Sequence, residues 1–217
     1  VDTSSCKSNI DVVRLALQEL QWKEIPGGKF GTPSDLVWNS INHSENPNLT
    51  TGFVNKFPGI GTLLHKVNLF RSLDIMRQLY PDEYDFYPMS FYLPHQMADF
   101  NAHYRTLVKN RKSYKNQLMF IAKPDEGTQG DGIYLLQGPD EFRSANNRNY
   151  VVQEYLNNPL LLEGFKFDLR LYVVVRSIEP LSIYIYQEGM ARFCTVPYQT
   201  ANTKNIRDSY MHLTNYS

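Results

Sequence analysis

The order of strand-forming segments in the second half of the chain limits the possible folds more than any other feature. Apolar and β-branched residues dominate these segments, which are residues 118–123, 132–136, 149–156, 165–175, 181–187 and 190–196. Apolar residues at helical spacing are concentrated earlier, over residues 10–20, 60–79 and 95–109. The sequence therefore predicts a mixed α/β protein of the α+β kind, in which helices and strands are partly separated along the chain.

The last three strand-forming segments follow one another closely. Turn-forming pairs separate them, first Glu179-Pro180 and then Glu188-Gly189. Short turns between successive strands are typical of antiparallel neighbours. The sequence therefore predicts that residues 165–175, 181–187 and 190–196 form a three-stranded antiparallel meander.

The first strand of this meander has an unusual polar face. Because side chains alternate between the two faces of a strand, Lys166, Asp168, Arg170 and Tyr172 share one face. This order of cation, anion, cation and phenol suits a cleft that binds phosphates and carboxylates. A solvent-facing strand with ion pairs would show the same pattern, so the strand by itself leaves both interpretations open.

A glycine-rich segment, KPDEGTQGDGI over residues 123–133, joins two predicted strands. No Gly-Lys-Ser/Thr follows, which excludes a P-loop, and the glycines lead into a strand, which excludes a Rossmann fingerprint. Such a turn can fold over the phosphates of a nucleotide and offer them backbone N–H groups, with Lys123 adding a cation. A flexible hairpin with an exposed lysine is the alternative.

Charge and residue counts exclude several other classes. Lys+Arg and Asp+Glu are 22 each, so the chain lacks the basic excess of a non-specific nucleic-acid binder. It has no apolar run near the ~20 residues that span a bilayer, and no signal-peptide pattern. Its two cysteines lie far apart, which suits a reducing, cytoplasmic compartment. The five histidines have no zinc spacing, and serine-hydrolase and kinase signatures are missing. We expect neither a nucleic-acid partner nor a membrane span.

Taken in order, five segments resemble the tubulin tyrosine ligase-like family, nearest to its polyglutamylase branch. They read VNKFPG, IAKPDEGTQGDGIYLL, VVQEYLNNPLLLEGFKFDLRLYVVV, ARFCTVPYQ and MHLTNYS. The resemblance implies an ATP-grasp-type fold with a small N-terminal domain, a central lobe and an incomplete C-terminal catalytic lobe. We expect these parts to cover residues 1–57, 58–156 and 157–217.

The same resemblance implies an ATP-dependent ligase that uses Mg²⁺. ATP would phosphorylate a glutamate side chain in a tubulin tail, and the amine of an incoming L-glutamate would attack the acyl phosphate to form an isopeptide bond. The implied partner is tubulin in microtubules, and the implied location is the cytoplasm and the microtubule cytoskeleton, including cilia and basal bodies. We expect a monomer.

The resemblance also assigns roles to individual residues. Those expected to act in catalysis are Lys166, Asp168 and Arg170. Those expected to bind the incoming amino acid are Arg192 and Ser217, and Lys66 is expected near the cleft. Those expected to bind ATP are Lys123, Gln129, Gly130, Gln153, Glu154, Tyr155, Leu156, Lys166, Phe167, Asp168, Thr214 and Asn215, with residues 153–156 at the adenine.

One part of the family pattern is missing. The family's magnesium ligands come after the HLTNYS segment, and this sequence ends at Ser217. We therefore expect no metal ligand within these residues, and expect that the 217 residues are part of a longer protein and inactive by themselves, because phosphoryl transfer needs a bridging metal.

Two other functions remain open at this point. A glycine or tyrosine ligase would keep the fold and change the donor. Arg192 favours glutamate, whose side-chain carboxylate needs a cation, but an arginine can also hold the α-carboxylate that every amino acid has. A non-catalytic tubulin-binding protein is the third possibility, against which the intact Lys123, Lys166 and Asp168 argue.

Overall fold

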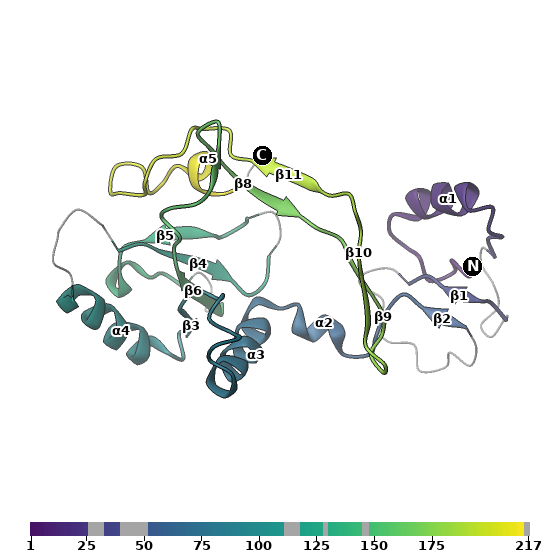
Figure 1. Cartoon of the computed structure of the whole chain (residues 1–217), viewed down its shortest axis with the longest axis horizontal. Coiled ribbons are helices and arrows are strands. Elements are labelled where there is room, and N and C mark those ends of the chain that lie inside the picture. Colours follow the sequence, from purple (N-terminus) through teal and green to yellow (C-terminus); the bar gives the residue numbers. More distant parts are fainter. Residues whose placement is uncertain (26–32, 40–51, 111–117, 128–129, 145–147, 215–217) are drawn as a thin grey trace. The chain divides into compact units, whose positions relative to one another are not determined.

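The computed structural model describes residues 1–25, 33–39, 52–110, 118–127, 130–144 and 148–214. Its contacts divide the chain into two compact units, Val1–Leu64 and His65–Ser217 (Figure 1). The fold is mixed α/β, as the sequence predicts. The expected functional boundaries near residues 57 and 156 remain predictions.

The first unit is small. It contains the helix α1 (Ile10–Glu19), the parallel strands β1 (Leu36–Val37) and β2 (Phe53–Val54), and the single helical turn α2 (Ile60–Leu63). The helix predicted over residues 60–79 is interrupted, because His65 has an extended backbone with φ −65° and ψ 135°. A second helix, α3 (Lys66–Leu79), therefore begins the second unit.

A four-stranded antiparallel sheet forms the centre of the second unit. Its strands, in the order β3-β6-β4-β5, are β3 (Ser90–Leu93), β6 (Tyr150–Glu154), β4 (Phe120–Pro124) and β5 (Tyr134–Leu136). The helix α4 (Met97–Asn110) follows β3, and the short 3-10 helix η1 (Pro139–Glu141) follows β5. Three of the four strands thus lie where the sequence predicts them, over residues 118–123, 132–136 and 149–156.

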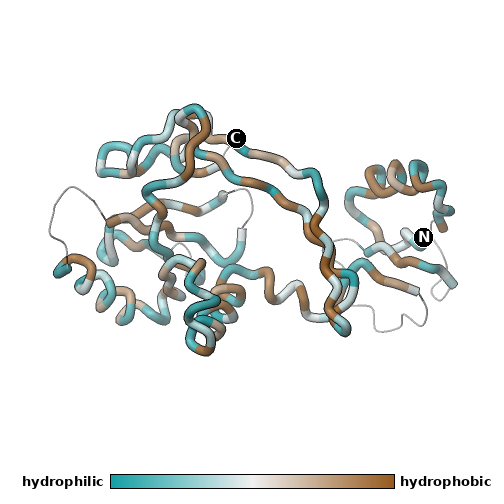
Figure 2. Tube along the Cα trace, viewed as in Figure 1, coloured by the Kyte–Doolittle hydropathy of each residue, from teal (hydrophilic) through white to brown (hydrophobic). Residues whose placement is uncertain are grey.

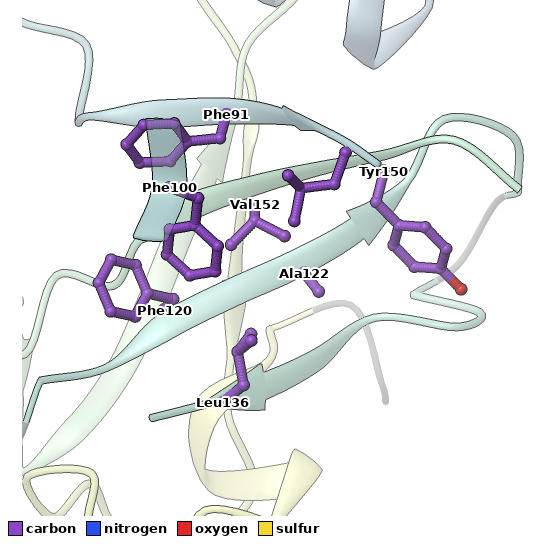
Figure 3. Packing of buried hydrophobic residues seen from close by; sticks show 8 residues of the cluster. Phe91, Phe100, Phe120, Ala122, Leu136, Tyr150 and Val152 are labelled. Atoms are coloured by element: carbon purple, nitrogen blue, oxygen red, sulfur yellow. The ribbon is translucent and has the colours of Figure 1, made fainter. Parts of the chain in front are cut away.

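Aromatic residues of this sheet and of α4 form the largest core (Figure 3). The Phe100 ring meets Phe120 edge-on at 5.0 Å between centroids and lies 5.2 Å from the Phe91 ring. On the opposite face of the sheet, Val151 packs with residues of α3. Neighbouring residues of β6 therefore enter different cores, which explains why its sequence is apolar at successive positions instead of alternating.

The predicted three-stranded meander is wrong. The strand β8 (Phe165–Arg170) pairs with β11 (Met190–Phe193) and with the short β7 (Leu161–Leu162), whereas β9 (Val173–Ser177) pairs with β10 (Ser182–Ile185). Residues 165–177 and 182–193 are thus the two arms of one long hairpin, which turns at Glu179-Pro180. Glu188-Gly189 is a break within the second arm and not a turn between paired strands. Local turn signals cannot tell these cases apart, because pairing depends on the distant arm.

Both strands of the outer part of this hairpin consist largely of hydrophobic residues (Figure 2). Val173, Val174, Ile183 and Ile185 are exposed by 54%, 60%, 51% and 65%. The chain ends in a loop and the four-residue helix α5 (Ser209–His212), whose N-cap Asp208 accepts a hydrogen bond from the Met211 N–H. Within the described ranges, no helix is both long and apolar enough to cross a bilayer.

Candidate active site

The pairing of β4 with β6 places a lysine beside a buried amide. Lys123 lies opposite Val151, and Ile121 lies opposite Gln153, so these four side chains share one face of the sheet. The Lys123 Nζ donates to Gln153 Oε1 at 2.8 Å, and Gln153 Nε2 donates to Ser90 Oγ at 2.9 Å. A network that begins in the core therefore holds the ammonium group of Lys123.

Two hydrophobic clusters cover the two ends of this face of the sheet, and Lys123 lies between them. At one end Val67 and Phe70 of α3 pack against Val151. At the other end Ala201, from the C-terminal loop, packs with Met119 and Tyr155. Lys123 and Gln153 lie between these two clusters in the register of the strands.

The glycine-rich segment is fastened to the start of α3. Asp125 Oδ1 accepts the backbone N–H of Val67 at 2.9 Å, and Lys66 Nζ donates to the Asp125 carbonyl at 3.2 Å. Carboxylates are favourable at a helix N-terminus, so this contact stabilises both elements. Further on, Gly130 and Gly132 have φ values of 83° and 69°, a left-handed backbone conformation that residues other than glycine rarely adopt. The segment therefore begins at a fixed point beside Lys66 and then turns sharply.

A second partly buried lysine lies on the strand β8. The Lys166 Nζ donates to the hydroxyl of Tyr155 at 2.9 Å and to the backbone carbonyl of His212 at 2.8 Å. Both acceptors are neutral. The β6 end, the β8 strand and α5 thus meet at the ammonium group of Lys166.

The ammonium groups act on one another electrostatically. Burial lowers the pKa of Lys123, and the charge of Lys66 lowers it further. Burial also lowers the pKa of Lys166, with an additional contribution from the charge of Lys123. We call Lys66, Lys123 and Lys166 the lysine cluster. Since a nearby anion would offset the repulsion that lowers the pKa of Lys123 and Lys166, the cluster suits a polyphosphate.

The charged face of β8 also holds an acid. Asp168 lies opposite Arg192 in the β8–β11 register, and its two carboxylate oxygens accept from Arg192 Nε at 2.7 Å and Nη2 at 2.6 Å. Thr214 Oγ1 donates to the same carboxylate at 2.6 Å. The Arg192 hydrogen bonds, together with Thr214 and the charge of Arg170, hold the pKa of Asp168 below its ordinary value. The structure thus brings Asp168, Arg192 and Thr214 together.

The residues expected at the adenine divide between two sides. Gln153 and Tyr155 contact the two buried lysines, as described above. The side chain between them, Glu154, turns the other way, and its Oε1 lies 2.6 Å from His103 Nε2 on α4. Leu156 is 65% exposed. Strand alternation explains this division, and an adenine contact by these residues remains a prediction.

Phe167 lies away from the lysine cluster. Its ring stacks on Phe193 with 5.6 Å between centroids, on the face of β8 opposite Lys166 and Asp168. A cavity of about 310 Å³ adjoins this pair and is lined by Leu162, Glu163, Phe165, Phe193 and Cys194. Its walls are mainly apolar.

His212 is a site residue that the sequence did not indicate. Its side chain is only 1% exposed, and its Nδ1 lies 3.1 Å from the Tyr155 hydroxyl that binds Lys166. The sequence spacing of His212 from the other histidines does not indicate a metal site. The one available signal was its place in an apolar MHL triplet, two positions before Thr214.

Three expected site residues, Gln129, Asn215 and Ser217, lie outside the described residues. Within the described ranges, no group of three His, Cys, Asp or Glu side chains can hold a metal ion. Both oxygens of Asp168 already bind Arg192, and one also binds Thr214. The described residues therefore do not fit a magnesium site.

Comparison with known proteins supports the reading of these segments. The sequence profile of the Tubulin-tyrosine ligase family matches residues 42–217. Tubulin polyglutamylase TTLL11 of Mus musculus is 44% identical over all of this chain, which covers 30% of that protein. Tubulin polyglutamylase ttll-11 of Caenorhabditis elegans is 45% identical over all of this chain, with 31% of that protein covered.

A more distant relative, tubulin polyglutamylase TTLL7 of Homo sapiens, is 35% identical over 97% of the chain and is covered to 23%. The chain thus spans less than a third of the length of these relatives. The profile match includes the glycine-rich segment, the lysines of β4 and β8, and the Asp168–Arg192–Thr214 group. The chain belongs to the tubulin-tyrosine ligase family.

Proposed function

We propose that this chain forms the nucleotide-binding part of an ATP-dependent ligase that adds glutamate to glutamate side chains in tubulin tails. The lysine cluster is the observation that carries the proposal. Three lysines from α3, β4 and β8 lie beside a glycine-rich turn anchored to a helix, and the charges of Lys66 and Lys123 lower the pKa of Lys123 and of Lys166 in turn. The names of the relatives, all tubulin polyglutamylases, support glutamate as the donor and tubulin as the acceptor.

Each part of the site has a role in this proposal. Lys66, Lys123 and Lys166 neutralise the phosphates of ATP, which supplies the energy to activate a carboxylate. Backbone N–H groups of the glycine-rich segment contact the same phosphates. Arg192 holds the incoming amino acid. Since Asp168 engages one N–H each of Nε and Nη2, an incoming carboxylate binds at the N–H groups that remain on Nη1 and Nη2 or takes the place of Asp168.

The activity test uses the natural protein that carries these residues. Purified tubulin is incubated with it, Mg-ATP and an equimolar mixture of glutamate, glycine and tyrosine, and the tubulin C-terminal peptides are weighed by mass spectrometry. Glutamate increments are expected. Mass increments of glycine or tyrosine would show that this amino acid, and not glutamate, is the donor. ATP binding without any increment would favour a non-catalytic tubulin-binding protein.

A second measurement tests the lysine cluster itself. We expect Lys123→Met to weaken binding of a fluorescent ATP analogue about tenfold or more, because a charge-assisted hydrogen bond to phosphate is lost. Lys109→Met removes an exposed lysine at the end of α4 and serves as the matched control. Equal affinity of the two variants would contradict the assignment of Lys123 to ATP.

The proposal extends to the setting of the reaction. We place the protein on the microtubule cytoskeleton, with cilia and basal bodies as the finer location, and expect it to act as a monomer. Fluorescence microscopy of the tagged natural protein against tubulin and a basal-body marker tests the location.

A further inference from the structure

The buried histidine of α5 is held in one orientation. Its ring lies between Tyr155 and Tyr198, and both tyrosine rings meet it edge-on, at 5.8 Å between centroids and 88° between planes. With 1% of its surface exposed, His212 has no access to bulk solvent. The positions of its two ring nitrogens are therefore set by the protein.

The partners of the ring determine where its proton lies. His212 Nε2 is 3.2 Å from the backbone carbonyl of Asn205, which can only accept, so Nε2 carries the hydrogen. Burial lowers the pKa of His212, and the charge of Lys166 adds to that effect, so both favour the neutral ring. Nδ1 is then an acceptor for the hydroxyl of Tyr155, 3.1 Å away, which also has a side-chain hydrogen bond with Tyr198.

The direction of this hydrogen bond fixes the next one. When the Tyr155 proton points to His212 and not to its second partner, Tyr198, the hydroxyl oxygen presents its lone pairs elsewhere, and Lys166 Nζ donates to it at 2.9 Å. The same ammonium also donates to the backbone carbonyl of His212 at 2.8 Å. His212 thus holds Lys166 twice, directly through its backbone and indirectly through Tyr155.

We propose that His212 is a positioning residue, whose neutral imidazole orients the Tyr155 hydroxyl and thereby fixes the Lys166 ammonium beside Lys123 to receive a polyphosphate. This role rests on the proposed function, which identifies that polyphosphate as ATP. If His212 only filled the space between two tyrosines, the affinity for ATP would not depend on whether residue 212 offers an acceptor at the place of Nδ1.

Two substitutions of His212 separate these roles. In His212→Asn the amide oxygen can take the place of Nδ1 and accept from Tyr155. In His212→Gln the longer amide can reach the place of Nε2 and donate to Asn205, but its oxygen then does not lie at the place of Nδ1, where Tyr155 donates. Tyr155→Phe removes the hydroxyl and keeps the ring. The control for that change is Tyr134→Phe, which removes a hydroxyl on β5 that donates a hydrogen bond to the backbone carbonyl of Arg143.

The first readout is affinity for a fluorescent ATP analogue, measured on the natural protein. We expect about a tenfold loss for Tyr155→Phe and His212→Gln, and less than about a threefold loss for His212→Asn and Tyr134→Phe. Equal losses for His212→Asn and His212→Gln, matched by equal drops in melting temperature, would overturn the proposal and leave a packing role.

The second readout needs no nucleotide. Trace acetic anhydride acylates lysines, and mass spectrometry compares Lys166 with the exposed Lys109 of the same molecule. Loss of the hydroxyl acceptor favours the neutral amine and frees its side chain, so the Lys166 rate should rise several-fold in Tyr155→Phe and His212→Gln and stay unchanged in His212→Asn. An unchanged rate in all three would overturn the proposal.

The two readouts also separate this inference from the proposed function. If the natural protein binds the ATP analogue but transfers no glutamate, the ligase proposal fails and the affinity series still decides the role of His212. If it binds no ATP, the acylation series decides that role alone.

Discussion

Burial changes the chemistry of single side chains at this site. The pKa of Lys123 and that of Lys166 are lowered because burial removes water from both ammonium groups and a neighbouring lysine charge repels each of them. Among the residues that the structure describes, neither ammonium group has a carboxylate within ion-pair distance, so keeping both charged costs stability. A bound polyphosphate would recover that cost, which is a physical reason for such residues to be kept in a binding site and not in a structural core.

The ion pair of Asp168 and Arg192 should make stability depend on acid pH. The unfolded chain has the ordinary aspartate pKa of about 3.9, and the folded value is lower, chiefly because of Arg192. The pair's contribution is therefore complete above the ordinary pKa and is lost as the pH falls through the folded pKa. We expect Asp168→Asn to destabilise the protein by up to about 1 kcal/mol at neutral pH, since both side chains are 36% exposed.

Urea unfolding at neutral pH and at about pH 2 measures this effect. The difference in unfolding free energy between the natural protein and Asp168→Asn should be present at neutral pH and should disappear at about pH 2. Asp82→Asn, at an exposed turn after α3, should show little difference at either pH. A gap for Asp168→Asn that persists unchanged in acid would mean that the ion pair is not its source.

At the scale of elements, the main device is the attachment of the glycine-rich segment to α3. One carboxylate, that of Asp125, accepts a backbone N–H at the first turn of the helix, and the adjacent Lys66 binds the carbonyl of the same residue. The helix start, the end of β4 and the beginning of the segment are therefore joined at one residue. The glycines beyond it supply the left-handed turns that the segment needs.

Removing that attachment should loosen the segment. We expect Asp125→Ala to lower the free energy of unfolding by about 1 kcal/mol, as for other lost helix caps, and to weaken binding of the ATP analogue several-fold. Asp131→Ala, in the same segment and exposed, is the matched control. If both variants lose the same affinity, the attachment to α3 is not what orders the segment.

At the scale of the molecule, every described residue that we assign to the site belongs to the second unit. Lys66 lies at its beginning and Thr214 near its end. That unit also holds the aromatic core between the four-stranded sheet and α4, together with the smaller core under α3. A unit with its own core and a complete set of these residues should fold and bind nucleotide by itself.

Residues 65–217, produced by themselves, test this expectation. We expect one cooperative thermal transition, followed by circular dichroism, and an affinity for the ATP analogue within about threefold of that of residues 1–217. The variant Lys123→Met in the same short chain should lose that binding. Failure to unfold cooperatively, or an affinity more than tenfold weaker, would mean that residues 1–64 contribute to the core or to the site.

Some features of the fold could be predicted because they depend on neighbouring residues. Alternation along residues 165–170 correctly placed Lys166, Asp168 and Arg170 on one face, and apolar runs located β4, β5 and β6. The interrupted helix at His65 and the long hairpin could not be predicted in the same way. Strand pairing in that hairpin depends on residues of the opposite arm, so Glu188-Gly189 gave a turn signal where the structure has only a break.

The amino-acid sequence by itself determined the mixed α/β class, the charged strand, the glycine-rich segment and membership of the tubulin-tyrosine ligase family, because each depends on residue types in a short or ordered pattern. Only the tertiary structure decided which lysines influence one another, that Asp168 engages Arg192 and Thr214, and that His212 belongs to the site. Tyr155 and His212 are 57 positions apart. A hydrogen bond between residues so far apart in the sequence depends on how the end of β6 packs against α5, and no local sequence pattern encodes that packing.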